Sequence, residues 1–205
     1  MSRLHTIAPA DATGPAAALF GAIKQAIGTV PNAYATAGSN SPVALKAALA
    51  LDSSLRESSL SARQIEIVKL VVSASVGCDY CVAAHTLMGK KVGLSGDSLR
   101  ALRGDGDTGD AADNALAHFA RALVGSTGTV PAAQVDAVRA AGYSDAQIVD
   151  TLLAIASITF TNLLNRVNDT PLDFPAVDWA DCTDGNRSGE HARPAGCVHR
   201  AVPDL

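Results

Sequence analysis

Apolar residues recur at helical spacing along most of the chain, and small polar residues, proline and glycine separate the apolar runs. Hydrophobic residues make up 48% of the sequence and aromatic residues only 4%. Alternating β-branched runs bounded by turn residues, which would predict strands, are not evident. This pattern predicts an all-α fold of roughly eight helices.

Prolines and glycines fall where helix ends are expected. Pro15 and Pro42 suit first-turn positions, and Ser41 before Pro42 can cap a helix. Four glycines follow directly after apolar runs and predict helix C-termini: Gly28, Gly93, Gly125 and Gly142.

Two of the predicted helices begin alike. Residues 61–64 and 144–147 both fit the capping box S-x-x-Q, in which serine and glutamine side chains satisfy free backbone groups at a helix start. The similarity continues to residues 74 and 157, and it indicates a faint internal duplication of a helical hairpin. On this alignment the second copy has Thr161, Leu164 and Asn168 where the first has Cys78, Cys81 and His85. Only the first copy can carry thiol chemistry.

The composition changes near residue 178. Residues 1–177 are expected to form one helical domain, whereas residues 178–205 are polar, rich in Gly, Pro, Arg and Asp, and lack an amphipathic period. Such a segment is typical of a flexible tail or of an arm packed on a neighbouring subunit.

Charge and hydropathy exclude several classes of partner. The net charge is −4, and Lys and Arg are scattered, so neither nucleic acid nor an anionic membrane surface is an expected partner. The N-terminal residues lack the apolar core of a signal peptide, and no later apolar stretch reaches the ~18 residues needed to cross a bilayer. We therefore expect a soluble, cytoplasmic protein.

Two cysteines and a histidine form the most informative motif. Cys78 and Cys81 make a C-x-x-C pair, and His85 follows four residues later. In a helix these three side chains share one face. A disulfide across three residues would constrain little of the fold, so the pair indicates redox or metal chemistry.

A carboxylate precedes the cysteines. Glu66 lies in an apolar run, and Gly77 can end that helix so that another begins near Cys78. Unpaired N–H groups and the helix dipole favour thiolate there, so Cys78, nearest the helix start, is expected to have the lower pKa. If the two helices pack antiparallel, Glu66 can meet His85.

The arrangement Glu66, eleven residues, Cys78-x-x-Cys81, three residues, His85 resembles the signature of the alkylhydroperoxidase D (AhpD) branch of the carboxymuconolactone decarboxylase superfamily. Three further segments resemble its peroxidase-related members: residues 30–34, 60–68 and 160–175. The resemblance covers roughly residues 15–177.

The resemblance implies a multihelical AhpD-like bundle that assembles as a dimer, trimer or hexamer and reduces hydroperoxides without a cofactor. By position, Cys81 would be the peroxidatic thiol, Cys78 the resolving thiol, and His85 with Glu66 the proton relay. A lipoyl-type or thioredoxin-type dithiol would then restore the pair. Tyr80 departs from the family pattern, since the best-known members have histidine there, and a phenol with a pKa near 10 is no equivalent base. Tyr80 is therefore a candidate for either packing or proton donation.

Other functions fit the same residues. The dithiol could exchange with other disulfides, or act as a redox sensor without turnover. A lactone decarboxylase is less favoured, because that reaction needs no disulfide. A zinc site would have to add Cys182, His191, Cys197 or His199 from the tail, whose spacing is unlike that of zinc ribbons, so no metal is expected. His118 is expected to pack on a helix.

Overall fold

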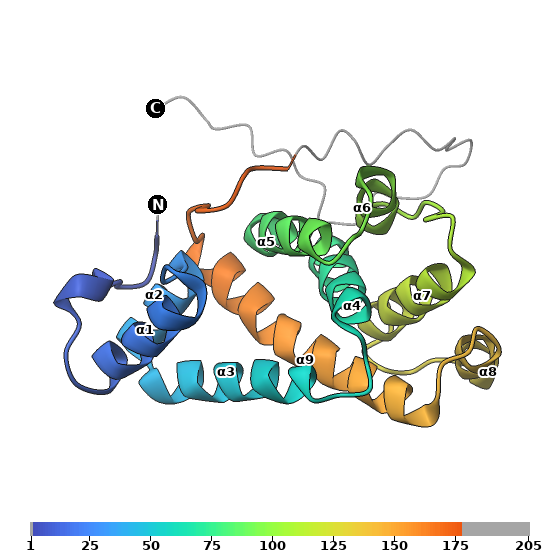
Figure 1. Ribbon diagram of the computed structural model, residues 1–205, viewed down its shortest axis with the longest axis horizontal. Helices are drawn as coiled ribbons and strands as arrows, with labels where there is room; N and C mark the ends of the chain where they lie inside the picture. Colours follow the sequence, from blue (N-terminus) through green and yellow to red (C-terminus); the bar gives the residue numbers. More distant parts are fainter. Residues whose placement is uncertain (1, 178–205) are drawn as a thin grey trace.

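The computed structural model describes residues 2–177, and within this range all regular structure is helical (Figure 1). A short 3-10 helix, Pro9–Asp11, precedes nine α-helices, one more than the rough prediction of eight. The all-α fold class is confirmed. The helices are α1 (Gly14–Ile27), α2 (Asn32–Asn40), α3 (Pro42–Arg56), α4 (Ala62–Ser75), α5 (Asp79–Lys91), α6 (Gly96–Arg103), α7 (Ala111–Gly125), α8 (Ala132–Ala140) and α9 (Asp145–Asn168).

Helix α4 lies at the centre of the bundle and packs mainly against α5, α7 and α9 (Figure 1). Its apolar run is completely buried, from Ile67 and Val68 to Leu70, Val71 and Val72. Burying each such side chain contributes about 1.5–3 kcal/mol, so α4 stabilises the core substantially. A smaller cluster around Phe20, Ile23 and Leu45 joins α1, α2 and α3.

Helix α9 crosses the molecule from α8 to α2 (Figure 1) and also contacts α3, α4 and α5. Its 24 residues include a window of mean hydropathy 1.4, enough by length and composition to cross a bilayer. The expectation that no such stretch exists is therefore wrong. The helix nevertheless packs within the bundle and turns Asn162, Asn165 and Asn168 inward. Of that window 28% is buried, so one face of α9 packs in the bundle and another is exposed.

Most predicted helix ends are present. Ser41 accepts a hydrogen bond from the Ala44 N–H at the start of α3. Gly28, Gly93 and Gly142 follow α1, α5 and α8 with φ of 84°, 88° and 97°, a left-handed conformation that glycine adopts without a Cβ penalty. Gly125 differs from expectation, because it is the last residue of α7 and the chain turns two and three residues later.

The predicted duplication of a hairpin is only partly present. Both capping boxes form, at Ser61 and at Ser144. However, α4 ends at Ser75, whereas α9 continues unbroken to Asn168. The reason is local: Gly77 breaks the first segment with φ of 66°, and Phe160 occupies the matching position of the second. The similarity is thus one of helix starts, not of hairpins. The predicted tail, residues 178–205, lies outside the described residues.

Candidate functional site

A single turn between α4 and α5 places the two cysteines. Gly77 donates its N–H to the Ala74 carbonyl (3.2 Å) and Cys78 donates to the Ser73 carbonyl (3.0 Å), the two bonds of a Schellman motif. Cys78 is at the same time the N-cap of α5, since its carbonyl accepts the first intrahelical bond from Val82 (2.9 Å). Cys81 follows in the first turn of α5. The turn at Gly77 therefore ends α4 and allows α5, which carries Cys81, to begin directly after it.

Glu66 and His85 meet across the α4–α5 contact. The Glu66 Oε2 lies 2.7 Å from His85 Nδ1, and both side chains are 16% exposed. A carboxylate on Nδ1 fixes the orientation of the imidazole and leaves Nε2 to gain or lose a proton. The structure thus brings together the two residues that the sequence placed nineteen positions apart.

The two thiols differ in acidity, in the opposite order to the one expected from the helix dipole. A hydrogen bond to Cys81, together with burial, raises the pKa of Cys78 well above that of an ordinary thiol. The hydrogen bond from Cys78, the charge of His85 and side-chain hydrogen bonds from α9 lower the pKa of Cys81 to about 7, against burial. A hydrogen bond donated by Cys78 favours the thiolate at Cys81, the reverse of the order that the helix dipole alone predicts.

Helix α9 supplies Asn165, which belongs to a polar stretch for which the sequence left open a subunit contact, the pocket lining or chance surface polarity. Asn165 is 4% exposed and donates from Nδ2 to Cys81 Sγ at 3.3 Å. Thr161, on the preceding turn, also lowers the Cys81 pKa through a side-chain hydrogen bond. The available signal was the run of asparagines in an apolar helix, which is unusual unless the amides have buried partners.

Tyr80 points to a different part of the fold. Its hydroxyl accepts a hydrogen bond from the Ala33 N–H (3.3 Å) at the start of α2, and its ring packs edge-on against Phe174 with centroids 5.4 Å apart. Burial raises its pKa above that of an ordinary phenol. These contacts join α5 to α2 and to the segment after α9, so they favour packing over proton donation.

A second buried ion pair lies one turn along α4 from Glu66. Lys69 Nζ is 2.6 Å from Asp52 Oδ1, which also accepts from Ser157 Oγ (2.7 Å), while Tyr34 donates to Asp52 Oδ2 (3.2 Å). Burial opposes ionisation of Asp52, but Lys69 and the hydrogen bonds lower its pKa. The pair ties α3 to α4 and α9 beside the dithiol.

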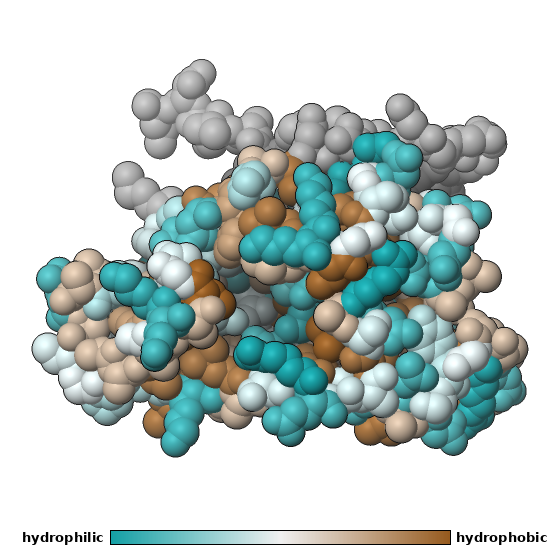
Figure 2. All heavy atoms as spheres, in the orientation of Figure 1, coloured by the Kyte–Doolittle hydropathy of each residue, from teal (hydrophilic) through white to brown (hydrophobic). Residues whose placement is uncertain are grey.

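Access to the sulfurs is narrow. Cys78 and Cys81 are 1% and 3% exposed, whereas the neighbouring Glu66 and His85 side chains reach solvent in part. Figure 2 shows a hollow in the middle of one face, over the area that α2, α3 and α5 enclose in Figure 1. A molecule that reacts at Cys81 must be small, or the surrounding side chains must move.

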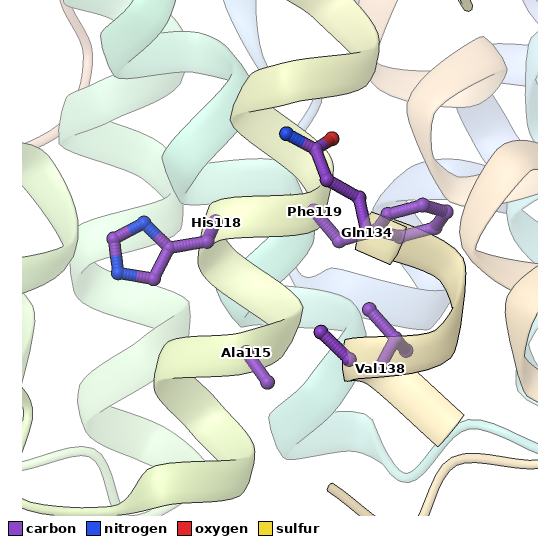
Figure 3. Close-up of a pocket in the computed structure, with 6 residues that line it drawn as sticks. Ala115, His118, Phe119, Gln134 and Val138 are labelled. Atoms are coloured by element: carbon purple, nitrogen blue, oxygen red, sulfur yellow. The ribbon is translucent and has the colours of Figure 1, made fainter. Parts of the chain in front are cut away.

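His118 lies in a different place. A hollow between α7 and α8 is lined by Ala115, His118, Phe119, Gln134, Ala137 and Val138, and Figure 3 shows the His118 ring on the side of α7 away from Val138. The ring is 66% exposed and lies 3.8 Å from Asp105 Oδ1. It is therefore a surface group and does not pack as expected. No residue of the thiol site lines this hollow.

The described part of the chain contains no group of three or more His, Cys, Asp or Glu side chains placed to hold a metal ion. Cys182, His191, Cys197 and His199, considered for a zinc site, lie outside the described residues. Cys78 and Cys81 are free thiols.

Comparison with known proteins gives a family match over part of the chain and a fold. Residues 42–124, which include Glu66, Cys78, Cys81 and His85, match the model of the carboxymuconolactone decarboxylase family. No curated protein matches the chain in sequence.

Three solved structures have similar folds. A peroxidase-related protein with an AhpD core from Ralstonia eutropha JMP134 has a TM-score of 0.73 and 20% identity, over 84% of this chain and 92% of that one. The debrominase Bmp8 has a TM-score of 0.70 and 19% identity, over 84% and 93%. A peroxidase-related protein from Silicibacter sp. TM1040 has a TM-score of 0.68 and 22% identity, over 83% and 94%.

The matched segment contains the complete Glu-Cys-Cys-His pattern, and the helices around it are arranged as in the AhpD-like proteins. Residues 42–124 are thus similar to the carboxymuconolactone decarboxylase family, and the fold of the described chain is that of AhpD-like proteins.

Proposed function

We propose that this protein is a thiol-dependent peroxidase that reduces small hydroperoxides with the Cys78–Cys81 dithiol. The family supports an enzyme of the AhpD and carboxymuconolactone decarboxylase class. The observation that carries the finer assignment is the acidic Cys81 thiol on the same helix as a histidine held by Glu66 at 2.7 Å.

In the first step, the Cys81 thiolate attacks the terminal oxygen of ROOH. An S–O bond forms, the O–O bond breaks, and Cys81 becomes a sulfenic acid. The alkoxide leaving group takes a proton, which a protonated His85 can supply, and departs as ROH. Proton transfer of this kind contributes on the order of 100-fold to 10,000-fold to a rate.

In the second step, the Cys78 sulfur attacks the Cys81 sulfenic sulfur. The S–S bond forms, and hydroxide leaves with the Cys78 proton as water. An external dithiol then exchanges with this disulfide, becoming oxidised as both cysteines regain their protons. Its chemical class, lipoyl-type or thioredoxin-type, follows from the family resemblance.

The division of roles rests on acidity. In this proposal the hydrogen bond from Cys78 and the charge of His85 lower the pKa of Cys81, so Cys81 is the sulfur that reacts as thiolate. Cys78 is already adjacent and needs no large movement to resolve the sulfenic acid.

Stopped-flow consumption of hydrogen peroxide by the prereduced protein tests the assignment. We expect the Cys81→Ser variant to consume no peroxide above background, and the Cys78→Ser variant to reduce one equivalent and then stop. Equal rates for the wild-type protein and the Cys81→Ser variant would refute the peroxidase. A bulky tertiary hydroperoxide should react more slowly than hydrogen peroxide, because both sulfurs are buried.

Two other functions remain as outcomes. If peroxide reacts slowly but a dithiol or disulfide substrate exchanges rapidly, the protein is a thiol-disulfide oxidoreductase. If oxidation changes only assembly, it is a redox sensor. Because one similar structure is a debrominase, and its Cys→Ala variant was solved with 2,3,4-tribromopyrrole, that compound belongs in the substrate panel.

A homo-oligomer and a cytoplasmic location also remain proposals. Four exposed apolar side chains lie along one face of α9: Val149, Leu152, Leu163 and Val167. Such a stripe is self-complementary across a two-fold axis, so a second copy would cover it. We expect the double variant Leu163→Lys, Val167→Lys to lower the mass measured by light scattering, without changing the helical content.

A further inference from the structure

The part of α9 that faces the dithiol contains two buried amides. Asn165 and Asn162 are 4% and 3% exposed and lie three residues apart, so they are neighbours on one helix face. Asn165 Nδ2 donates to Cys81 Sγ at 3.3 Å, and Asn162 Oδ1 accepts from Ser73 Oγ at 3.2 Å. Each side-chain amide thus has one of its two polar atoms in a hydrogen bond.

The other half of each amide has no hydrogen-bond partner among the described residues. These atoms are Asn165 Oδ1, an acceptor, and Asn162 Nδ2, a donor, and both are inaccessible to solvent. A buried polar atom without a partner costs about 1–3 kcal/mol. A small group that both donates and accepts hydrogen bonds would satisfy both atoms.

A hydroperoxide and a sulfenic acid are both groups of this kind, since each O–H donates one hydrogen bond and its oxygen accepts another. Asn165 Nδ2, Asn165 Oδ1 and Asn162 Nδ2 are in place before any reaction, because α9 is continuous and both asparagines are buried. Preorganised donors of this type favour charge that develops during a reaction.

We propose that Asn165 is a positioning residue that holds the Cys81 thiolate through Nδ2, and that Asn165 Oδ1 and Asn162 Nδ2 receive the oxygen that Cys81 gains from the peroxide. The inference rests on the proposed function and adds a subsite to it. Thiolate attack transfers this oxygen to Cys81 while the O–O bond breaks, and the sulfenic O–H then donates to Asn165 Oδ1. Such a subsite favours a hydroperoxide, whose reacting oxygen carries the O–H that the subsite can bind.

The contribution of Asn165 can be separated from the other groups around Cys81. Cys78 and His85 act from α5, Thr161 acts from α9, and the Tyr34 and Tyr80 hydroxyls are close enough to sense the thiolate charge. None of these is altered by a change at Asn165. Asn168 provides a matched amide on the same helix: it is completely buried, but its hydrogen bonds go to Ser2, Arg3, Leu4, Thr36 and Thr170.

The test is the pKa of the Cys81 thiol, followed by thiolate absorbance at 240 nm in the Cys78→Ser background. We expect Asn165→Leu to raise it by about one unit, the effect of one hydrogen bond to a charged acceptor. Asn165→Asp, which keeps the shape but places a carboxylate at the sulfur, should raise it further. Asn168→Ala should leave it unchanged while lowering the unfolding temperature.

The oxygen subsite has its own measurement. With both cysteines present, Asn162→Leu should lower the amount of sulfenic acid that dimedone traps during a peroxide pulse. The pKa of the Cys81 thiol should stay the same. An unchanged pKa in both Asn165 variants would overturn the positioning role. If the pKa shifts as expected but the wild-type protein consumes no peroxide, the thiolate contact stands and the peroxidase assignment fails.

Discussion

Helices α4 and α9 begin with the same capping box and then differ completely. Helix α4 ends after 14 residues, two positions before the left-handed Gly77, and Cys78 is the N-cap of the next helix. In α9 the corresponding position is Phe160, and the helix continues to 24 residues. One segment provides the reactive thiols, and the other provides a rigid polar surface behind them.

This difference shows how little sequence change separates a reactive element from a supporting one. Cys81 is acidic because groups from both segments act on it: Cys78 and His85 from the broken one, Asn165 and Thr161 from the continuous one. Glu66, in turn, holds His85 from α4. The predictions below test whether these two sides have the separate roles that the geometry assigns.

The largest effect is expected at His85. His85→Ala removes both the proton carrier and a positive charge near Cys81, so peroxide turnover should fall on the order of 100-fold to 10,000-fold. His118→Ala is the matched control, because that histidine is exposed on α7 and takes no part in the thiol site. Steady-state turnover with a dithiol reductant measures both. Equal losses in the two variants would mean that His85 acts only through stability.

The pH dependence of Cys81 reactivity is expected to be the next largest effect. The folded protein lowers the Cys81 pKa to about 7 from the ordinary 9.0, so the reactive thiolate predominates above pH 7. Alkylation of the Cys78→Ser variant by iodoacetamide should fall about tenfold for each unit below pH 7 and level off above it. Serine is chosen for position 78 so that its hydroxyl can still donate a hydrogen bond to Cys81. A rate that keeps rising to pH 9 would contradict a tuned thiol.

Much of this arrangement could be predicted from the sequence because it is local. The capping boxes, the glycine turns and the shared face of Cys78, Cys81 and His85 each depend on residues fewer than ten positions apart. Glu66 and His85 are farther apart, but a short turn between two apolar helices leaves few ways to pack them. The helix at Gly77 ends where the sequence indicated.

What could not be predicted depends on contacts between distant segments. Asn165 is 84 residues from Cys81, and nothing in its neighbourhood identifies which element it faces. The order of the two thiol pKa values depends on which cysteine keeps its proton, and a backbone dipole argument does not decide that. Tyr80 is fixed by Ala33 and Phe174, one from each end of the described chain.

Replacement of Gly77 tests the origin of the difference between the two segments. Its φ of 66° suits glycine and is tolerated by asparagine, whereas a β-branched residue there is strained by about 1–2 kcal/mol or more. We expect Gly77→Val to lower the free energy of unfolding by that amount and also to reduce Cys81 reactivity, because the start of α5 moves. Gly77→Asn should retain most of both. Chemical denaturation and alkylation rates measure the two effects, and a fully reactive Gly77→Val protein would show that the turn does not position the thiols.

Tyr80 should show the smallest effect on catalysis, although it lies between the two cysteines in sequence. Tyr80→Phe keeps the edge-on ring contact with Phe174 but leaves the Ala33 N–H without its buried acceptor, so the unfolding free energy should fall by about 1–3 kcal/mol. Peroxide turnover should change little at a temperature where the variant is folded, because the hydroxyl faces α2. A stable variant with turnover reduced more than about tenfold would instead identify the phenol as a proton donor. Tyr80 and His85 both lie on α5, on successive turns. That outcome would therefore mean that Tyr80, and not His85, protonates the leaving alkoxide.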